Sequence, residues 1–184
     1  MEDHPPYDPR SIANYLLEMA WKYELNITHL SLQKIIYFLH ERFLKETGTP
    51  LCKGYFVAWK HGPVHPQIWS TFKNAGREPI RHHAYGLDIL TGLPSQVPVI
   101  ENKKVQLYLT SKGLDLISVP AHRLVGLSHL PGSPWDRVTK RSGGQREYGS
   151  RISDELMLSS RSAGVAPIRE SLEGNEDLYE QPPS

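Results

Sequence analysis

Histidine and cysteine are the residue types in this chain that most readily support metal binding or nucleophilic catalysis. The 184 residues include nine histidines and a single cysteine, Cys52. His61 and His65 stand four apart, but a glycine and a proline between them prevent the helical His-x3-His arrangement that binds zinc. His82 and His83 are adjacent, and neighbours in sequence rarely converge on one ion. Because no cysteine pair or carboxylate partner completes a ligand set, we expect no metal and no cofactor.

The motifs of nucleophilic and phosphate chemistry are also missing from the sequence. There is no Gly-x-Ser-x-Gly turn, and no local signature links Cys52 to a histidine, so the expected role of this cysteine is buried packing. The glycine-rich stretch at 141–146 follows no strand and opens no helix, as a phosphate-binding loop would. These observations predict a protein that is not an enzyme.

Tryptophan is the remaining residue type with a strong capacity for binding. Trp59 and Trp69 flank a predicted turn at Gly62 and Pro63, and packing in the core is the expected role of Trp69. Trp135 follows a proline in a loop rich in glycine and proline. For Trp135 the sequence leaves two roles open, packing against the main helices or anchoring a partner.

The elements that position these residues are mainly helical. Capping residues, apolar spacing and terminal glycines predict helices at 9–25, from Thr28 or Ser31 to 47, and from 66 to 74. A short aromatic run at 54–59 predicts a strand, and 97–100 with 105–109 predict a hairpin. Further helices are expected at 110–118 and from 120 onward, with a loop at 130–135. The predicted fold class is mainly α (α+β), a compact helical domain with a small β element.

Composition divides the chain unevenly. The last 44 residues contain 12 apolar side chains, five basic groups and eight acidic groups, too little apolar surface to offset the entropy of ordering. We expect an N-terminal extension at 1–9, a domain at 10–138 and a polar tail at 139–184. A short helix is expected at 153–160, and residues 162–184 are expected to be disordered.

Charge and hydropathy exclude several classes of protein. The formal net charge is +1, so no global field attracts nucleic acid or anionic lipid. No apolar run is long enough to cross a bilayer, and no signal peptide is visible, which predicts a cytoplasmic protein. A basic cluster (Lys140, Arg141, Arg146 and Arg151) keeps DNA binding open as an alternative, although the second helix exposes charges of both signs rather than a basic face.

Three segments, taken in order, resemble one known family. Residues 32–38 (LQKIIYF), 56–66 (FVAWKHGPVHP) and 127–135 (LSH followed by SPW) are similar to motifs of the Panacea domain, the SocA-like antitoxin family that also occurs in phage-associated proteins. The resemblance covers about residues 10–138. We expect a structural role for Leu32, Gln33, Lys34, Tyr37, Phe38, Trp59, Gly62, Pro63, Val64, Trp69, Ser128 and His129.

The resemblance implies an antitoxin that binds and neutralises a cognate protein toxin encoded beside it, and it brings no catalytic residues. Some members act as adaptors that deliver a toxin to a protease, so a proteolytic adaptor is an alternative, as is a DNA-binding autoregulator or phage-encoded regulator. We predict that the toxin-binding surface lies on exposed edges near His61, His65, Trp135 and the 77–104 segment.

Overall fold

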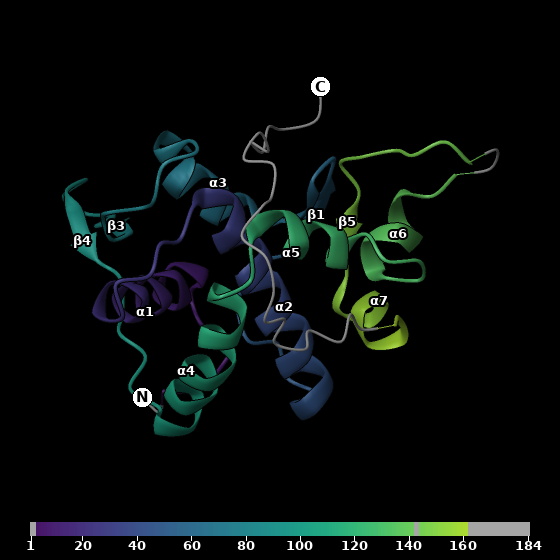
Figure 1. Cartoon of the computed structure of the whole chain (residues 1–184). Coiled ribbons are helices and arrows are strands. Elements are labelled where there is room, and N and C mark those ends of the chain that lie inside the picture. The colour runs from purple at the N-terminus through teal and green to yellow at the C-terminus, as the bar shows by residue number, and fades with distance from the viewer. Residues whose placement is uncertain (1–2, 142–143, 162–184) are drawn as a thin grey trace.

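Helices dominate the structure, a computed structural model that describes residues 3–141 and 144–161 (Figure 1). The α-helices in these residues are α1 (Pro9–Lys22), α2 (His29–Thr47), α3 (Pro66–Phe72), α4 (Lys103–Ile117), α5 (Ala121–Ser128), α6 (Pro134–Thr139) and α7 (Asp154–Ser159). The strands are β1 (Phe56–Trp59), β2 (Gly62–Val64), β3 (Tyr85–Leu87), β4 (Pro94–Gln96) and β5 (Arg151–Ile152), and a 3₁₀ turn, η1 (Lys73–Ala75), continues α3. The predicted fold class, mainly α with a small β element, is confirmed. Within the described ranges no helix is long and apolar enough to span a membrane.

Helix α2 begins and ends where its sequence provides caps. The Thr28 side chain accepts a hydrogen bond from the backbone N–H of Ser31, and the Ser31 hydroxyl accepts one from the backbone N–H of Thr28. Gly48 ends the helix in the left-handed conformation that glycine adopts without steric cost. The predicted helix from Thr28 to residue 47 is therefore confirmed.

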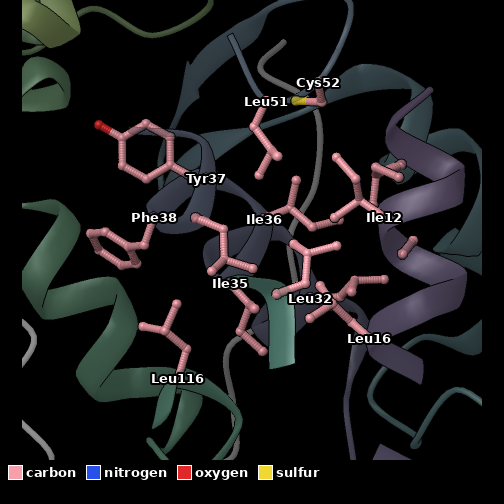
Figure 2. Packing of buried hydrophobic residues seen from close by; sticks show 14 of the residues in the cluster. Ile12, Leu16, Leu32, Ile35, Ile36, Tyr37, Phe38, Leu51, Cys52 and Leu116 are labelled. Carbon is pink, nitrogen blue, oxygen red and sulfur yellow. The ribbon is translucent and has the colours of Figure 1, made fainter. Parts of the chain in front are cut away.

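The core surrounds α2. Helices α1, α4, α5 and α7 and strand β2 all contact it, so the helix is buried on most of its circumference. In Figure 2 its side chains lie between Ile12 and Leu16 of α1 on one side and Leu116 of α4 on the other. Burial on several sides explains why apolar residues of α2 extend well beyond one stripe.

The first sheet has the strand order β2-β1-β5, with both pairs antiparallel. The prediction that Gly62 and Pro63 form a turn is wrong, because both residues lie in β2 and the turn is at Lys60 and His61. Glycine is required at 62 because its φ is +104° and a Cβ there would lie 2.5 Å from the Ser128 hydroxyl.

The predicted hairpin of 97–100 and 105–109 is wrong, since 105–109 lies in α4. The Asn102 side chain accepts hydrogen bonds from the backbone N–H groups of Lys104 and Val105 and so starts the helix there, earlier than the predicted start at 110. Helical spacing then buries Val105 and Leu109 in the core. The hairpin is formed instead by β3 and β4, with Tyr85 paired to Gln96.

The folded part of the chain continues past the expected domain boundary at 138. Strand β5 extends the sheet along β1, and Ile152 is buried beside it. Helix α7 lies where the short helix at 153–160 was expected; Ser153 caps it and Met157 is fully buried in the core. The residues expected to be disordered, 162–184, lie outside the described ranges.

Residues 3–8, expected to be an extension, also pack on the domain. The backbone of Tyr7 donates to the Leu51 carbonyl at 2.9 Å and accepts from the Lys53 N–H at 2.7 Å. The Asp3 carboxylate accepts a hydrogen bond from the N–H of Asn102 at 2.6 Å, next to the start of α4. These bonds connect the N-terminal segment to the loop after α2 and to the start of α4.

Candidate protein-binding surface

The structure places the candidate metal ligands apart from one another. Among the residues it describes, no group of three or more His, Cys, Asp or Glu side chains is arranged to hold a metal ion. His82 lies against the ring of Phe72, whereas His83 contacts Trp21 edge-on with ring centroids 4.9 Å apart. The two adjacent histidines therefore have different surroundings.

Cys52 has a histidine partner that sequence reasoning missed. The Sγ of Cys52 lies 3.2 Å from Nδ1 of His40, and Nε2 of His40 lies 3.1 Å from a carboxylate oxygen of Asp154. This order of thiol, imidazole and carboxylate is also that of a cysteine-protease triad. No local motif signals it, because α2, the loop at 51–53 and α7 bring the three residues together from distant parts of the chain.

The surroundings of Cys52 nevertheless oppose nucleophilic chemistry. The residue is only 3% exposed, and burial, with a smaller contribution from the charge of Asp154, raises the pKa of its thiol far above the ordinary value. The thiol is thus protonated and shielded from substrate. The His40 bond to Asp154 instead attaches α7 to the central helix.

Two of the three predicted partner-binding residues are not on an exposed edge. His65 is 3% exposed; its ring donates from Nε2 to the Lys53 carbonyl at 2.9 Å, and its backbone N–H donates to the Gln33 side chain at 2.8 Å. Burial lowers the pKa of His65. The expectation of exposure is wrong for His65, while His61, in the turn between β1 and β2, is partly exposed.

Trp135 packs inside the domain, which decides between its two open roles. It lies in α6, which starts at Pro134 after a Ser133 cap rather than continuing the predicted loop. Its indole N–H donates to the Trp59 carbonyl at 2.8 Å, and its ring packs against that of His129, with centroids 3.7 Å apart. At 3% exposure it is not available as a surface anchor.

The residues of the sequence motifs form a framework between α2, the sheet and α5. Lys34 is fully buried and its ammonium donates to the Pro63 carbonyl at 2.9 Å. Burial and the charge of Lys34 together lower the pKa of His129 to about 4. Trp59 and Trp69 meet edge-on with ring centroids 5.5 Å apart. Leu32, Tyr37, Phe38 and Val64 lie in the core, and Ser128 is buried beside β2.

Large apolar side chains are exposed together in one segment, the β3–β4 hairpin. We call the following residues the hairpin surface: Tyr85, Leu87, Ile89, Leu90, Leu93 and Val99. Ile89 and Leu90 at the tip are 97% and 95% exposed. The other exposed large apolar side chains are distributed over several elements, whereas these six lie within 15 consecutive residues, so this segment is the candidate binding surface.

The hairpin is held on α1 by side-chain bonds to its backbone. The Asn14 amide donates to the Ala84 carbonyl at 3.0 Å and accepts from the Ala84 N–H at 2.7 Å. Arg10 donates to the Tyr85 carbonyl at 3.1 Å. At the tip, the Asp88 carboxylate accepts hydrogen bonds from the N–H and hydroxyl of Thr91, which closes the turn.

A pocket of about 210 Å³ lies between α1 and the base of the hairpin. Its walls come from α1 and from both ends of the hairpin, including Tyr15, Tyr85, Val97 and Val99. The 77–104 segment was predicted to contain part of the interface, and the hairpin surface and one side of this pocket lie within it. The signal that marks this region in the sequence is a stretch at 84–100 in which Asp88 is the one charged residue.

Comparisons with known proteins agree with the sequence motifs. A family model described as "Antitoxin SocA-like, Panacea domain" matches residues 32–92. The curated protein "Antitoxin SocA" of Caulobacter vibrioides (strain NA1000 / CB15N) is 36% identical over 156 residues, which cover 85% of this chain and 83% of that protein. This chain belongs to the SocA-like antitoxin family. No solved structure matches it significantly.

Family membership confirms the resemblance inferred from the three motifs. The segment matched by the SocA-like family model starts at Leu32 in α2 and ends at Gly92 in the tip of the hairpin. It therefore includes the buried framework around Lys34 and the first half of the hairpin surface. Ser128 and His129 lie beyond the matched segment but pack beside it.

Proposed function

We propose that the chain is a non-enzymatic antitoxin that neutralises a protein toxin by direct contact through the hairpin surface. The observation that carries the proposal is the exposure of six large apolar side chains in and beside one hairpin anchored to α1, in a member of an antitoxin family. Binding is favoured when a partner removes exposed apolar groups from water, because burial of apolar surface lowers the free energy of the complex. The partner is the product of a gene beside this one, met in the cytoplasm.

The alternatives receive less support from the described contacts. In the basic cluster, Arg141 pairs with Glu147 and Arg146 with Asp136, both at 2.7 Å, so these charges are already offset within the chain. A DNA-binding role would need them free for phosphate. A proteolytic adaptor would need an exposed segment that a protease can contact, and Met157 of α7 does not supply one because it is fully buried.

The test is co-expression with the neighbouring gene product, followed by growth measurement and co-purification. In a variant carrying both Ile89→Asp and Leu90→Asp, we expect toxicity to return and the dissociation constant to rise by about 30-fold or more, because two carboxylates replace interface anchors. Folding is expected to be unchanged, since both side chains are almost fully exposed.

The matched control is Leu107→Asp, a 70% exposed leucine on α4 outside the hairpin. It is expected to neutralise like the natural chain. The proposal fails when the double variant protects cells and binds as tightly as the control, or when the neighbouring product is harmless on its own.

A further inference from the structure

The β3–β4 hairpin has one exposed face and two edges, and these differ in what they offer a partner. Resting on the proposed function, we propose that the toxin docks on the exposed face through side chains and adds no strand to the hairpin. The toxin segment that docks there has apolar side chains and makes its main-chain hydrogen bonds within the toxin. The register of the two strands, the contacts of α1 and the positions of two prolines lead to this conclusion.

The register of the hairpin defines which side chains share a face. Tyr85 pairs with Gln96, and Leu87 pairs with Pro94. Because successive side chains of a strand point to opposite faces, these four residues share one face and the residues between them share the other. The four are exposed, whereas the residues between them are half-buried. We call these four residues the exposed face.

The exposed face contains no charged residue. Its two largest apolar side chains, Tyr85 and Leu87, are 58% and 69% exposed. The hairpin lies at the left edge of the molecule in Figure 1, beside α1. The tip residues Ile89 and Leu90 continue from the same strand and are almost fully exposed. Burial of apolar side chains is therefore what this face offers a partner.

The hydrogen bonds near the tip determine which main-chain groups point to the edges. The Asp88 N–H donates to the Leu93 carbonyl at 2.9 Å. Hydrogen-bonded and non-hydrogen-bonded residue pairs alternate along an antiparallel ladder, so Leu87 and Tyr85, like their partners in β4, turn their N–H and C=O groups outward. The Tyr85 carbonyl agrees with this, because it accepts a hydrogen bond from Arg10 of α1, outside the hairpin.

The edge of β3 is partly covered by side chains of α1. Asn14 bonds both main-chain groups of Ala84, and Arg10 donates to the Tyr85 carbonyl at 3.1 Å. A strand added along this edge would have to displace both side chains. Leu87 is the residue of β3 that lies beyond these contacts. One residue is too little for strand addition, because a strand is held by hydrogen bonds along several residues.

The edge of β4 is interrupted by proline. Pro94 occupies an outward position and has no N–H, and Pro98, two residues after Gln96, has none either. From 94 to 98, Gln96 is therefore the residue that presents both an N–H and a C=O on this edge. Proline on an edge strand hinders pairing with a strand of another chain.

A partner that buries the exposed face must therefore satisfy its own main-chain groups. An extended segment along either edge would find one residue to pair with and would bury unpaired N–H and C=O groups, which is unfavourable. A helix, or a strand within the toxin's own sheet, makes these hydrogen bonds internally. Strand addition derives its affinity from main-chain hydrogen bonds, whereas this hairpin offers side chains.

The mode of docking is tested by the affinity of the purified neighbouring gene product for variants of the full chain. Leu87→Asp places a carboxylate on the exposed face and is expected to raise the dissociation constant by about tenfold or more. Gln96→Pro removes the outward N–H, and its matched control, Gln96→Ala, loses the same side chain but keeps that N–H. These two variants are expected to bind within about twofold of each other. Urea unfolding shows whether each variant is folded.

A second measurement uses the natural complex and decides the question if Gln96→Pro does not fold. With the chain isotope-labelled, nuclear Overhauser effects are expected from toxin side chains to the side chains of Tyr85 and Leu87, and none between main-chain protons of the toxin and of residues 84–98. An added strand would give a regular series of main-chain contacts along one edge. Such a series overturns the inference, as does folded Gln96→Pro binding about tenfold more weakly than Gln96→Ala.

The tip variant separates failure of this inference from failure of the proposed function. When the Ile89 and Leu90 double variant loses binding but Leu87→Asp binds like the natural chain, the toxin contacts the tip without the exposed face. The inference is then overturned while the proposed function stands. When both variants bind normally, the proposed function itself fails.

Discussion

Single side chains decide how the candidate surface is presented. The Asn14 side-chain amide donates to the Ala84 carbonyl and accepts from the Ala84 N–H. It thus makes the two backbone hydrogen bonds that a neighbouring strand would otherwise make. Other residues that attract attention in the sequence, such as His65 and Trp135, prove to be buried and bonded. Chemical type alone does not separate these roles, because the same imidazole or indole serves packing and binding equally well.

The role of Asn14 is tested by the Asn14→Ala variant. Loss of two hydrogen bonds to a buried backbone is expected to lower the free energy of unfolding by about 1–2 kcal/mol. Amide hydrogen exchange in residues 84–96 is expected to accelerate, because the hairpin then opens locally. Asn74→Ala, at an exposed position in η1, is the control and is expected to change neither quantity. Unchanged exchange in the hairpin would falsify the anchoring role.

At the scale of elements, α7 joins the domain through contacts of several kinds. Met157 fills the core, Asp154 bonds His40, and the Ser160 carbonyl at its C-terminal end accepts from the Lys45 ammonium at 2.9 Å. Cations near a helix C-terminus also interact favourably with its dipole. The composition of the chain after residue 140 does not indicate that α7 packs on the domain. Its apolar content is low, and a six-residue helix needs few apolar residues to dock.

The contribution of α7 is tested by a pair of neighbouring substitutions. Met157→Ala removes a fully buried side chain and is expected to lower the free energy of unfolding by about 2–5 kcal/mol, as core truncations do. Leu158→Ala, at a half-exposed position on the same helix, is expected to cost less than about 1 kcal/mol. Urea unfolding of both variants measures the difference. Equal costs would mean that α7 does not pack on the domain in solution.

At the scale of the whole molecule, buried histidines make stability depend on pH. Burial, strengthened by the charge of Lys34, lowers the pKa of both His29 and His129 to about 4. The unfolded chain binds protons on these rings near pH 6.5, whereas the folded chain does not until about pH 4. Their contribution to stability is complete above pH 6.5 and is lost as the pH falls toward 4.

We therefore expect the urea midpoint to fall as the pH is lowered from 7 to 4.5. The double variant His29→Gln with His129→Gln is expected to be less stable at pH 7 but to show a flatter pH profile, because two sites of proton uptake are gone. His4→Gln, at an exposed position, serves as the control with the natural profile. Asp8 and Asp136 have pKa values lowered from 3.8, so their contribution to stability is lost mainly at pH values below those at which the two histidines take up protons. A double variant with the natural slope would contradict the assignment.

The amino-acid sequence by itself determined the central helix, the first helix and the family, because caps, apolar spacing and short motifs act within a few residues of one another. Thr28 and Gly48 mark the ends of α2 in any context.

Tertiary structure decided the rest. The buried positions of His65 and Trp135, the pairing of Cys52 with His40, and the docking of β5 and α7 depend on contacts between distant segments. The start of α4 at Asn102 is one example. The composition of residues 105–109 is typical of a strand, but the Asn102 cap and contacts with the core together favour a helix there. The hairpin surface became visible as a candidate site only because, among the described residues, folding leaves its apolar side chains exposed.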